Sequence, residues 1–268
     1  MKFNILLLSI ILISNLNLLG NEKVKIGIFK YEPYHINEKS GLLNDLYKAL
    51  FNSVNIEVEF VMLSPKRAEL ELLTGKIDMV SAHFLIQKKN HPLIFKMHIY
   101  NVIAALFYFP ENHDNKTFNS LKEIKGKKTG IIFNSAFKKI YEKNDISVQE
   151  IKDPSSMLEM AILKRIDFFE AAGLSGGYLL KKSKILKKAN FFVFINPDEG
   201  PAILKSNKRY EMIKSKLIKG YNKILKNGVY YKVIEKYWGI GNVPKDVLPS
   251  KIKIKGIKSP ILSKIPLR

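Results

Sequence analysis

The sequence predicts an α/β protein with two lobes, each a mostly parallel sheet flanked by helices. Between residues 24 and 80, strands alternate with helices of about ten residues, which is typical of right-handed βαβ crossovers and a parallel sheet. A polar turn at 110–115 interrupts this alternation, and a second βα pattern begins near residue 120. The apolar content of 46% and the aromatic content of 11% are those of a globular chain.

The first lobe opens with a strand at 24–29. This strand stops at Tyr31-Glu32-Pro33-Tyr34, where the proline imposes an extended or turn backbone. The pattern continues with a helix at 41–51, a strand at 56–62, a helix from Pro65 and a third strand after 74–79. Ligands of open α/β sheets bind at the carboxyl ends of strands, so Tyr31 and Tyr34 are expected at a ligand site.

The second lobe repeats this alternation. We expect a short helix after Ser120, strands at 128–133, 147–151 and 168–169, and helices at 136–141, 157–163 and 175–182. Extended crossings between the lobes are expected at 100–108 and 191–195, followed by helices at 208–226 and 229–237. The predicted domains are therefore a discontinuous lobe 1 (21–107 and 196–240), lobe 2 (108–195) and a basic tail (241–268), in which Lys251–Lys255 is an alternative edge strand.

The first twenty residues have the layout of a secretory signal peptide. Met1-Lys2 is a basic start, Phe3–Leu19 is largely apolar, and Gly20 precedes an expected mature start near Asn21. An uncleaved membrane anchor is the alternative. The chain has no cysteine, which excludes disulfides, thiolate metal sites, a thiol nucleophile and a lipid-modified cysteine. These features predict a soluble periplasmic protein without a lipid anchor.

The formal net charge of +21 is large, and residues 241–268 contribute +6 of it. For an exported protein, this charge predicts electrostatic contact with a membrane surface or cell wall rather than with nucleic acid. The alternative is a lysine-rich composition spread over solvated faces. The five histidines have no metal-binding spacing, so neither a metal nor another cofactor is expected.

The order of several motifs resembles a known family. Tyr-x-Pro-Tyr, Gly-Leu-Leu-x-Asp-Leu, Ser-Pro-Lys-Arg-Ala and Gly-Lys-Ile-Asp follow one another in the first lobe, and Tyr237-Trp238-Gly239 closes the pattern. This order is similar to the extracytoplasmic solute-binding proteins of family 3, the polar amino acid transporter type, and to a divergent subgroup with Pro-x-Lys-Arg-Ala. The resemblance covers about residues 24–239. It implies the type II periplasmic-binding-protein fold with two hinge crossings, in a monomer that closes on a small ligand for an ABC transporter or sensor.

The candidate ligand-binding residues follow strand ends in both lobes. Arg67 could present a guanidinium to a carboxylate, although a solvated arginine is the alternative. The loop at 134–135 could bind an anion at a helix N-terminus, or be an ordinary helix cap. His83 could hydrogen-bond a ligand, or be a half-buried polar residue. The full predicted set is Tyr31, Tyr34, Arg67, Ser81, His83, Phe84, Asn134, Ser135 and Glu170.

The sequence departs from the amino-acid binders of that family at two positions. Asn90 stands where they have an arginine for the ligand carboxylate, and near Ala172, where they have an aspartate for the ammonium, the closest acid is Glu170. We therefore expect a small polar, carboxylate-bearing or anionic ligand rather than a basic amino acid. Two alternatives stay open. One is an envelope interaction protein that kept the fold without a ligand. The other is an exported dehydratase-like enzyme using Glu32, Asp45, His83 or Glu170, although the prediction is that the protein is not an enzyme.

Overall fold

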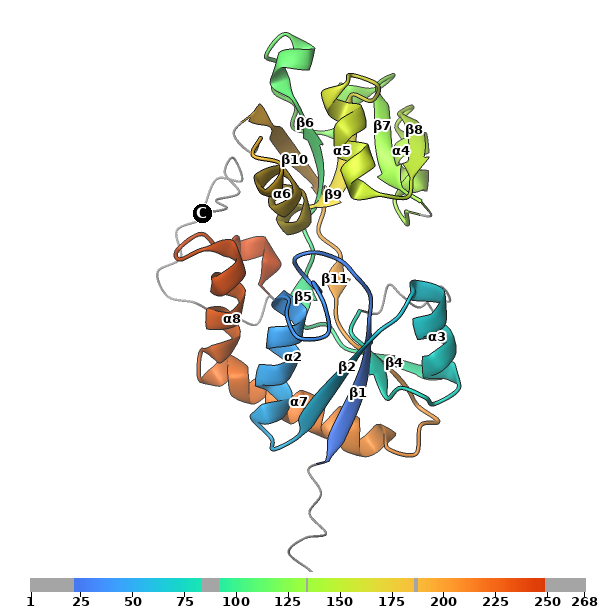
Figure 1. The fold of residues 1–268 in the computed structure, drawn as a ribbon, viewed down its shortest axis with the longest axis vertical. Coiled ribbons are helices and arrows are strands. Elements are labelled where there is room, and N and C mark those ends of the chain that lie inside the picture. Colours follow the sequence, from blue (N-terminus) through green and yellow to red (C-terminus); the bar gives the residue numbers. More distant parts are fainter. Residues whose placement is uncertain (1–21, 83–91, 134, 186–187, 249–268) are drawn as a thin grey trace, which may run out of the picture.

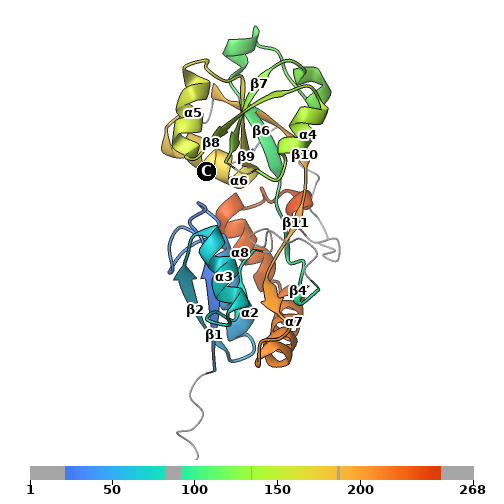
Figure 2. The same cartoon turned by 90° about the vertical axis from the view of Figure 1, so that its right-hand side faces the viewer.

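The computed structural model describes residues 22–82, 92–133, 135–185 and 188–248. They form two α/β lobes stacked along the long axis of the molecule (Figure 1). Two short strands, β5 (Tyr100–Asn101) and β11 (Asp198–Glu199), pair antiparallel between the lobes; Figure 1 labels both, and Figure 2 shows β11 between the lobes from the side. The predicted two-lobe fold class is confirmed.

Lobe 1 contains a mixed five-stranded sheet in the order β2-β1-β3-β12-β4. β1 pairs parallel with β2 and β3, and the returning strand β12 pairs antiparallel with β3 and β4. The strands are β1 (Lys23–Ile28), β2 (Glu57–Met62), β3 (Met79–Val80), β4 (Ile94–Lys96) and β12 (Ala202–Leu204). The helices are α2 (Leu42–Asn52), α3 (Pro65–Leu73), α7 (Tyr210–Lys226) and α8 (Val229–Trp238).

The two faces of this sheet bury separate cores. Alternate residues of β1, Val24, Ile26 and Ile28, pack with α2, α7 and α8, whose apolar faces include Leu50, Leu217 and Trp238. On the other face, α3 covers a smaller core that contains Ala68, Leu72 and Val80. This period of two along β1 is what places apolar residues toward one side of the sheet.

Lobe 2 contains a five-stranded sheet in the order β10-β6-β9-β7-β8. Its strands are β6 (Ala104–Tyr108), β7 (Lys128–Ile132), β8 (Ser147–Ile151), β9 (Phe168–Ala172) and β10 (Asn190–Ile195). Its helices are α4 (Lys138–Lys143), α5 (Pro154–Ile162) and α6 (Gly173–Lys182). Asp153 Oδ2 accepts a hydrogen bond from Ser156 N–H at 2.8 Å and caps α5, which begins at Pro154, three residues before the range predicted for this helix.

The predicted crossings between the lobes are wrong in position. Residues 104–108 and 190–195 are β6 and β10, an antiparallel pair within the lobe 2 sheet, and the crossings are β5 and β11. Both apolar runs are strands of a sheet because Phe107 packs on one face and Leu106 and Phe192 pack on the other. The predicted boundary at 107/108 therefore falls inside β6.

The predicted tail also begins later than residue 241. Val243, Val247 and Leu248 are buried in the lobe 1 core. Asn101 of β5 donates from Nδ2 to the carbonyl oxygens of Asp246 (2.8 Å) and Leu248 (3.3 Å). The chain up to residue 248 is thus part of lobe 1 and braces a crossing strand. The rest of the predicted tail and the predicted signal peptide lie outside the described residues.

The elements β7-α4-β8-α5-β9 of lobe 2 repeat β1-α2-β2-α3-β3 of lobe 1, so β7 and β1 are the first strands of the two repeats. In each lobe a lysine N–H of the first strand donates 2.8 Å to an aspartate just before the third, Lys25 to Asp78 and Lys128 to Asp167. Each first strand also has a glycine, Gly27 or Gly130, where an added Cβ would approach an isoleucine methyl to about 2.5 Å. The position three residues after the aspartate is Ser81 in lobe 1 and Glu170 in lobe 2.

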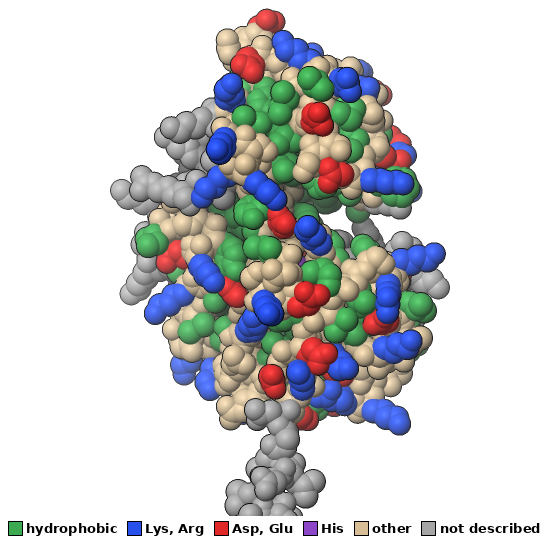
Figure 3. Space-filling view, viewed as in Figure 1, with side chains coloured by type: hydrophobic (Ala, Val, Ile, Leu, Met, Phe, Trp, Pro, Cys, Tyr) green, Lys and Arg blue, Asp and Glu red, His purple; other side chains and the backbone are tan. Residues whose placement is uncertain are grey.

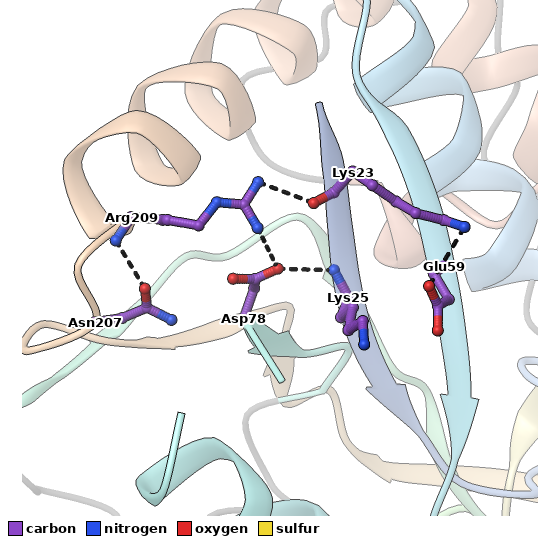
Figure 4. A network of polar contacts seen from close by, with 6 residues as sticks. All are labelled: Lys23, Lys25, Glu59, Asp78, Asn207 and Arg209. Carbon is purple, nitrogen blue, oxygen red and sulfur yellow. Dashed lines mark hydrogen bonds and ion pairs between the residues drawn. The ribbon is translucent and has the colours of Figure 1, made fainter. Parts of the chain in front are cut away.

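Asp78 also joins the lobe 1 sheet to α7 (Figure 4). Arg209, just before α7, donates 2.9 Å to Asp78 Oδ2 and 2.8 Å to the carbonyl of Lys23. The neighbouring Lys23–Glu59 ion pair, at 3.3 Å, is more exposed. Asp78 therefore has a structural role at the amino-terminal end of β1.

Among the described residues, no helix is long and apolar enough to cross a membrane.

Candidate functional site

The loop after β1 presents an aromatic stack toward lobe 2. Tyr31 and His35 exchange backbone hydrogen bonds of 2.9 Å, which fold the loop back on itself. The Tyr31 ring lies between those of Phe29 (centroids 5.4 Å) and Tyr34 (5.1 Å), both nearly parallel to it. Tyr34 is only 1% exposed and meets Tyr100 of β5 edge to face. The stack therefore connects the end of β1 with the hinge.

His35 is buried in a neutral hydrogen-bond network beneath this loop. His35 Nδ1 lies 2.6 Å from Asn44 Oδ1, and Nε2 lies 2.9 Å from Ser81 Oγ. An amide oxygen only accepts, so Nδ1 carries the proton and Nε2 accepts from the Ser81 hydroxyl. Burial lowers the pKa of His35 to about 4, and the bond to Asn44 opposes this shift. Ser81 is therefore engaged within lobe 1.

Lobe 2 places a buried carboxyl, Glu170, near the carboxyl end of β9. Glu170 is 8% exposed. It accepts from the Ser135 hydroxyl at 2.8 Å and from the Tyr141 hydroxyl at 2.9 Å. Burial raises the pKa of Glu170 from 4.5 to about 7, and these two hydroxyl donors oppose the shift. None of the described cationic side chains pairs with Glu170, so its charge is stabilised by hydroxyl groups alone.

The two lobes meet where α6 begins. Burial raises the pKa of Tyr31, the nearby Ser175 hydroxyl of α6 lowers it, and the charges of Glu170 and Glu199 raise it further. Leu174 of α6 packs into the lobe 1 core. Glu199, in the hinge strand β11, is buried and accepts from the Gly200 N–H at 2.9 Å. Tyr31 of lobe 1 is therefore within electrostatic range of Glu170 of lobe 2 and Glu199 of the hinge.

An ion pair spans the lobes beside this contact. Lys182 of α6 lies 3.7 Å from Glu32, which also lies 3.7 Å from Lys30. The pair is partly exposed and sits next to Tyr31 in the sequence. Figure 3 shows the molecule narrowed and hollowed between the two lobes. The charge of Glu170 in lobe 2 acts on Tyr31 in lobe 1, so these two residues lie near each other at the junction of the lobes.

The other predicted site residues have varied surroundings. Arg67 is 69% exposed and pairs with Glu71 at 2.7 Å, one helical turn along α3. Ser135 does not cap a helix, because α4 begins at Lys138 with Phe137 before it. The Ser135 hydroxyl instead accepts from Phe137 N–H and donates to Glu170, so it supports a carboxylate rather than an anionic ligand. His83, Phe84 and Asn134 lie outside the described residues.

Most of the described chain matches one known protein family. Residues 24–240 match the bacterial extracellular solute-binding proteins, family 3. The chain belongs to this family. A search of curated protein sequences gives no match. Within the described part of this family 3 protein, no group of three His, Asp or Glu side chains is arranged to hold a metal ion.

Several solved structures share the fold of this family 3 protein. The GluR0 ligand-binding core in complex with L-glutamate has a TM-score of 0.69 at 13% identity, covering 82% of this chain and all of that one. An ancestral arginine-binding protein bound to glutamine has a TM-score of 0.63 at 21% identity, covering 81% and 98%. An ancestral amino acid-binding protein, a precursor of cyclohexadienyl dehydratase, has a TM-score of 0.64 at 18% identity, covering 82% and 97%.

Sequence reasoning missed three residues of the cleft. Ser175 lies in the first turn of α6, Tyr141 lies on α4, and Glu199 lies between two proline residues in Pro197-Asp198-Glu199-Gly200-Pro201. The last has a recognisable signal, since an acid in a Pro/Gly-bounded crossing is held close to both lobes. Tyr141 could have been found through the repeat, because Tyr47 has the matching role in lobe 1, donating to the Ser81 carbonyl.

Proposed function

We propose that this family 3 protein is an exported, periplasmic solute-binding protein that closes on a small polar ligand between its lobes. It would deliver the ligand to an ABC transporter or a sensor and act as a monomer. The observation that carries this proposal is Glu170, a buried carboxyl on one wall of the cleft with hydroxyl partners only. A buried charge without a cationic partner is costly, and a ligand that supplies one recovers that cost.

We further propose that the ligand carries an ammonium group as well as the predicted carboxylate. Glu170 would accept the ammonium in place of the aspartate that other amino-acid binders have near Ala172. Tyr31 would cover an apolar or flat part of the ligand, because its ring is already held by Phe29 and Tyr34. Structural neighbours bound to glutamine and to L-glutamate support a ligand of this class.

Arg67 is the predicted partner of the ligand carboxylate, and the substitution Arg67→Ala tests this role. Its exposure and its ion pair with Glu71 predict that Arg67→Ala leaves ligand affinity within about twofold, as for a surface arginine. A loss of roughly 2 to 5 kcal/mol, the cost of unpairing a buried charge, would instead mean that Arg67 turns into the cleft on closure.

The deciding experiment identifies the ligand and then removes Glu170. Mass spectrometry of small molecules that accompany the purified protein would provide candidates, and an amino-acid panel would be screened by thermal shift. A ligand at 100 times its dissociation constant adds about 2.7 kcal/mol to the free energy of unfolding. Glu170→Gln should abolish this gain, whereas Glu142→Gln, an exposed change on α4, should not. No shift with any amino acid would favour a scaffold that has lost its ligand.

The enzyme alternative depends on the same residue. A carboxyl with a pKa of about 7 exchanges protons readily at neutral pH, as a general acid does. One structural neighbour is the precursor of a dehydratase. We favour binding without turnover because, among the described residues, no carboxyl, imidazole or amine side chain is paired with Glu170. Conversion of a bound ligand, lost in Glu170→Gln, would reverse that preference.

A further inference from the structure

Helix α8 and the residues that follow it hold the crossing strand β5 from the side, and we refer to this part of the chain (229–248) as the C-terminal brace. Asn101 of β5 donates from Nδ2 to the carbonyl oxygen of Asp246 at 2.8 Å. The Tyr230 hydroxyl of α8 donates to the carbonyl oxygen of Ile99, directly before β5, also at 2.8 Å. The crossing is therefore bonded to the brace at two of three successive residues.

The C-terminal brace is itself part of lobe 1. Tyr230, Trp238 and Val247 are buried in the lobe 1 core. The Tyr237 hydroxyl donates to Asp45 Oδ2 of α2 at 2.9 Å, which joins α8 to another helix of the same lobe. Side chains in a core are closely packed and do not move independently of it. The bonds from the brace therefore attach β5 to lobe 1.

The second crossing is attached to the brace through β5. The N–H of Ile99 donates to the carbonyl oxygen of Glu199 at 3.0 Å, and the N–H of Val102 donates to that of Pro197 at 2.9 Å. The two crossings are thus a bonded pair, and a restraint on β5 acts on both. Because Asn101 is tied to lobe 1, bending between the lobes falls on the lobe 2 side of this residue.

Tyr100 of β5 connects the brace with the aromatic stack of the cleft. Trp238 donates from Nε1 to the Tyr100 hydroxyl at 3.4 Å, and this hydroxyl donates to that of Tyr34 at 3.5 Å. All three side chains are buried, and Tyr34 stacks on Tyr31. A buried hydroxyl that loses its partner is costly, so these contacts favour one orientation of the Tyr100 ring. The brace therefore acts on the position of the stack as well as on the crossing.

We propose that the C-terminal brace restrains the hinge and keeps the ligand-free lobes close to the arrangement that binds ligand. This role rests on the proposed function, because closure on a ligand is the movement that the brace limits. A hinge consists of a few residues that absorb the change in backbone dihedral angles. With the brace in place, few residues of the crossings can bend, so the relative orientation of the lobes varies little. Without it, residues 98–103 bend together, the lobes sample more arrangements, and fewer molecules are competent to bind.

The test removes one bond of the brace by a substitution that keeps the size of the side chain. Asn101→Asp retains the oxygen that lies 2.6 Å from His98 Nε2, but it places a second oxygen against the carbonyl groups of the brace. The matched control is Asn112→Asp in lobe 2, where the same amide donates to a backbone carbonyl oxygen at 3.3 Å. Trp238→Phe is a milder second variant, which removes only the N–H donor to Tyr100.

The distance between the lobes is the measurement. Because the chain has no cysteine, Lys66→Cys on α3 and Lys139→Cys on α4, both exposed, place one spin label on each lobe. Double electron–electron resonance of the ligand-free full chain then gives the distribution of distances between the labels. Asn101→Asp should broaden this distribution, Trp238→Phe should broaden it less, and Asn112→Asp should leave it unchanged. Thermal unfolding of each variant establishes that it is folded.

Ligand affinity should follow the distances. A variant in which about a tenth of the molecules keep the competent arrangement should bind about tenfold more weakly. A distribution that is the same in Asn101→Asp and the wild type would overturn the brace even where a ligand binds, and so would a control variant that broadens as much. A distribution that broadens only in the brace variants of a protein without a ligand would support the brace and reject the proposed function.

Discussion

Replacing Glu170 by glutamine is expected to stabilise the ligand-free protein above neutral pH. Burial raises the pKa of Glu170 from 4.5 to about 7, so between these values the folded state binds more protons than the unfolded state. The stability that Glu170 contributes is therefore complete below pH 4.5 and is lost as the pH rises through 7. Each pH unit corresponds to about 1.4 kcal/mol, which makes the loss about 3 kcal/mol.

Glutamine keeps the shape of Glu170 without its charge. Its amide oxygen can still accept from Ser135 and Tyr141, and it does not ionise. At pH 8, Glu170→Gln should therefore be about 3 kcal/mol more stable than the wild type, or about 6 °C higher in melting temperature for a chain of this size. At pH 4.5 the two proteins should be nearly equal, because the carboxyl is then protonated in the wild type as well.

The assay is thermal and urea unfolding of both proteins at pH 4.5 and pH 8. Glu142→Gln, an exposed substitution on α4, should leave stability unchanged at both values. The reasoning is refuted if Glu170→Gln and the wild type respond to pH in the same way, or if the variant is the less stable protein at pH 8. Either outcome would mean that Glu170 is already paired with a cation in the ligand-free protein.

Three further substitutions test the structural argument. Burial lowers the pKa of His35 to about 4, so its contribution is lost as the pH falls from 6.5 toward 4 and offsets the opposite trend of Glu170. In His35→Gln this offsetting contribution is absent, so the free energy of unfolding should fall by about 3 kcal/mol between pH 4.5 and 7 in urea titrations. A pH profile identical to that of the wild type would contradict this expectation. Asp78→Ala should cost about 3 kcal/mol and Glu59→Ala at most about 0.5 kcal/mol in urea unfolding, whereas equal costs would show that the Asp78 network adds nothing. Gly220→Ala places a Cβ 2.4 Å from the carbonyl oxygen of Leu50 and should cost about 1 to 3 kcal/mol; a more stable variant would mean that α2 and α7 separate freely.

The sequence predicted the elements of both lobes better than the connection between them. The helix at α3 and the strand at β2 have strong local signals, since proline starts the former and alternating residues form the latter. The hinge strands β5 and β11 are only two residues long and carry no periodicity. The longer apolar runs at β6 and β10 were therefore assigned as crossings, although burial on both faces, as in β6, is typical of a strand inside a sheet.

The site was predictable where it follows strand ends and not where it depends on tertiary contacts. Tyr31 and Glu170 were both selected from the sequence, and the charge of Glu170 acts on Tyr31 across the junction of the lobes. Ser81 was selected for the same reason, but the buried His35 already takes its hydroxyl. Arg67 was selected for its charge at a helix start, and Glu71 one turn later offers it a nearby partner. The role of a polar side chain depends on the partner that it contacts, and the packing of the folded chain determines that partner.

The two lobes repeat the same elements, and at one matching position they differ in charge because lobe 2 has Glu170. Ser81 and Glu170 occupy matching positions in the two lobes. Tyr47 of α2 contacts Ser81, and Tyr141 of α4 contacts Glu170. In lobe 1 the position is neutral and saturated by His35, whereas in lobe 2 it is a carboxyl held by hydroxyls. An ammonium group beside Glu170 would lower its pKa again and recover part of the roughly 3 kcal/mol lost at pH 8. The stabilisation by a saturating ammonium ligand should therefore be larger at pH 8 than at pH 5, and a ligand whose thermal shift is independent of pH would have to bind without approaching Glu170.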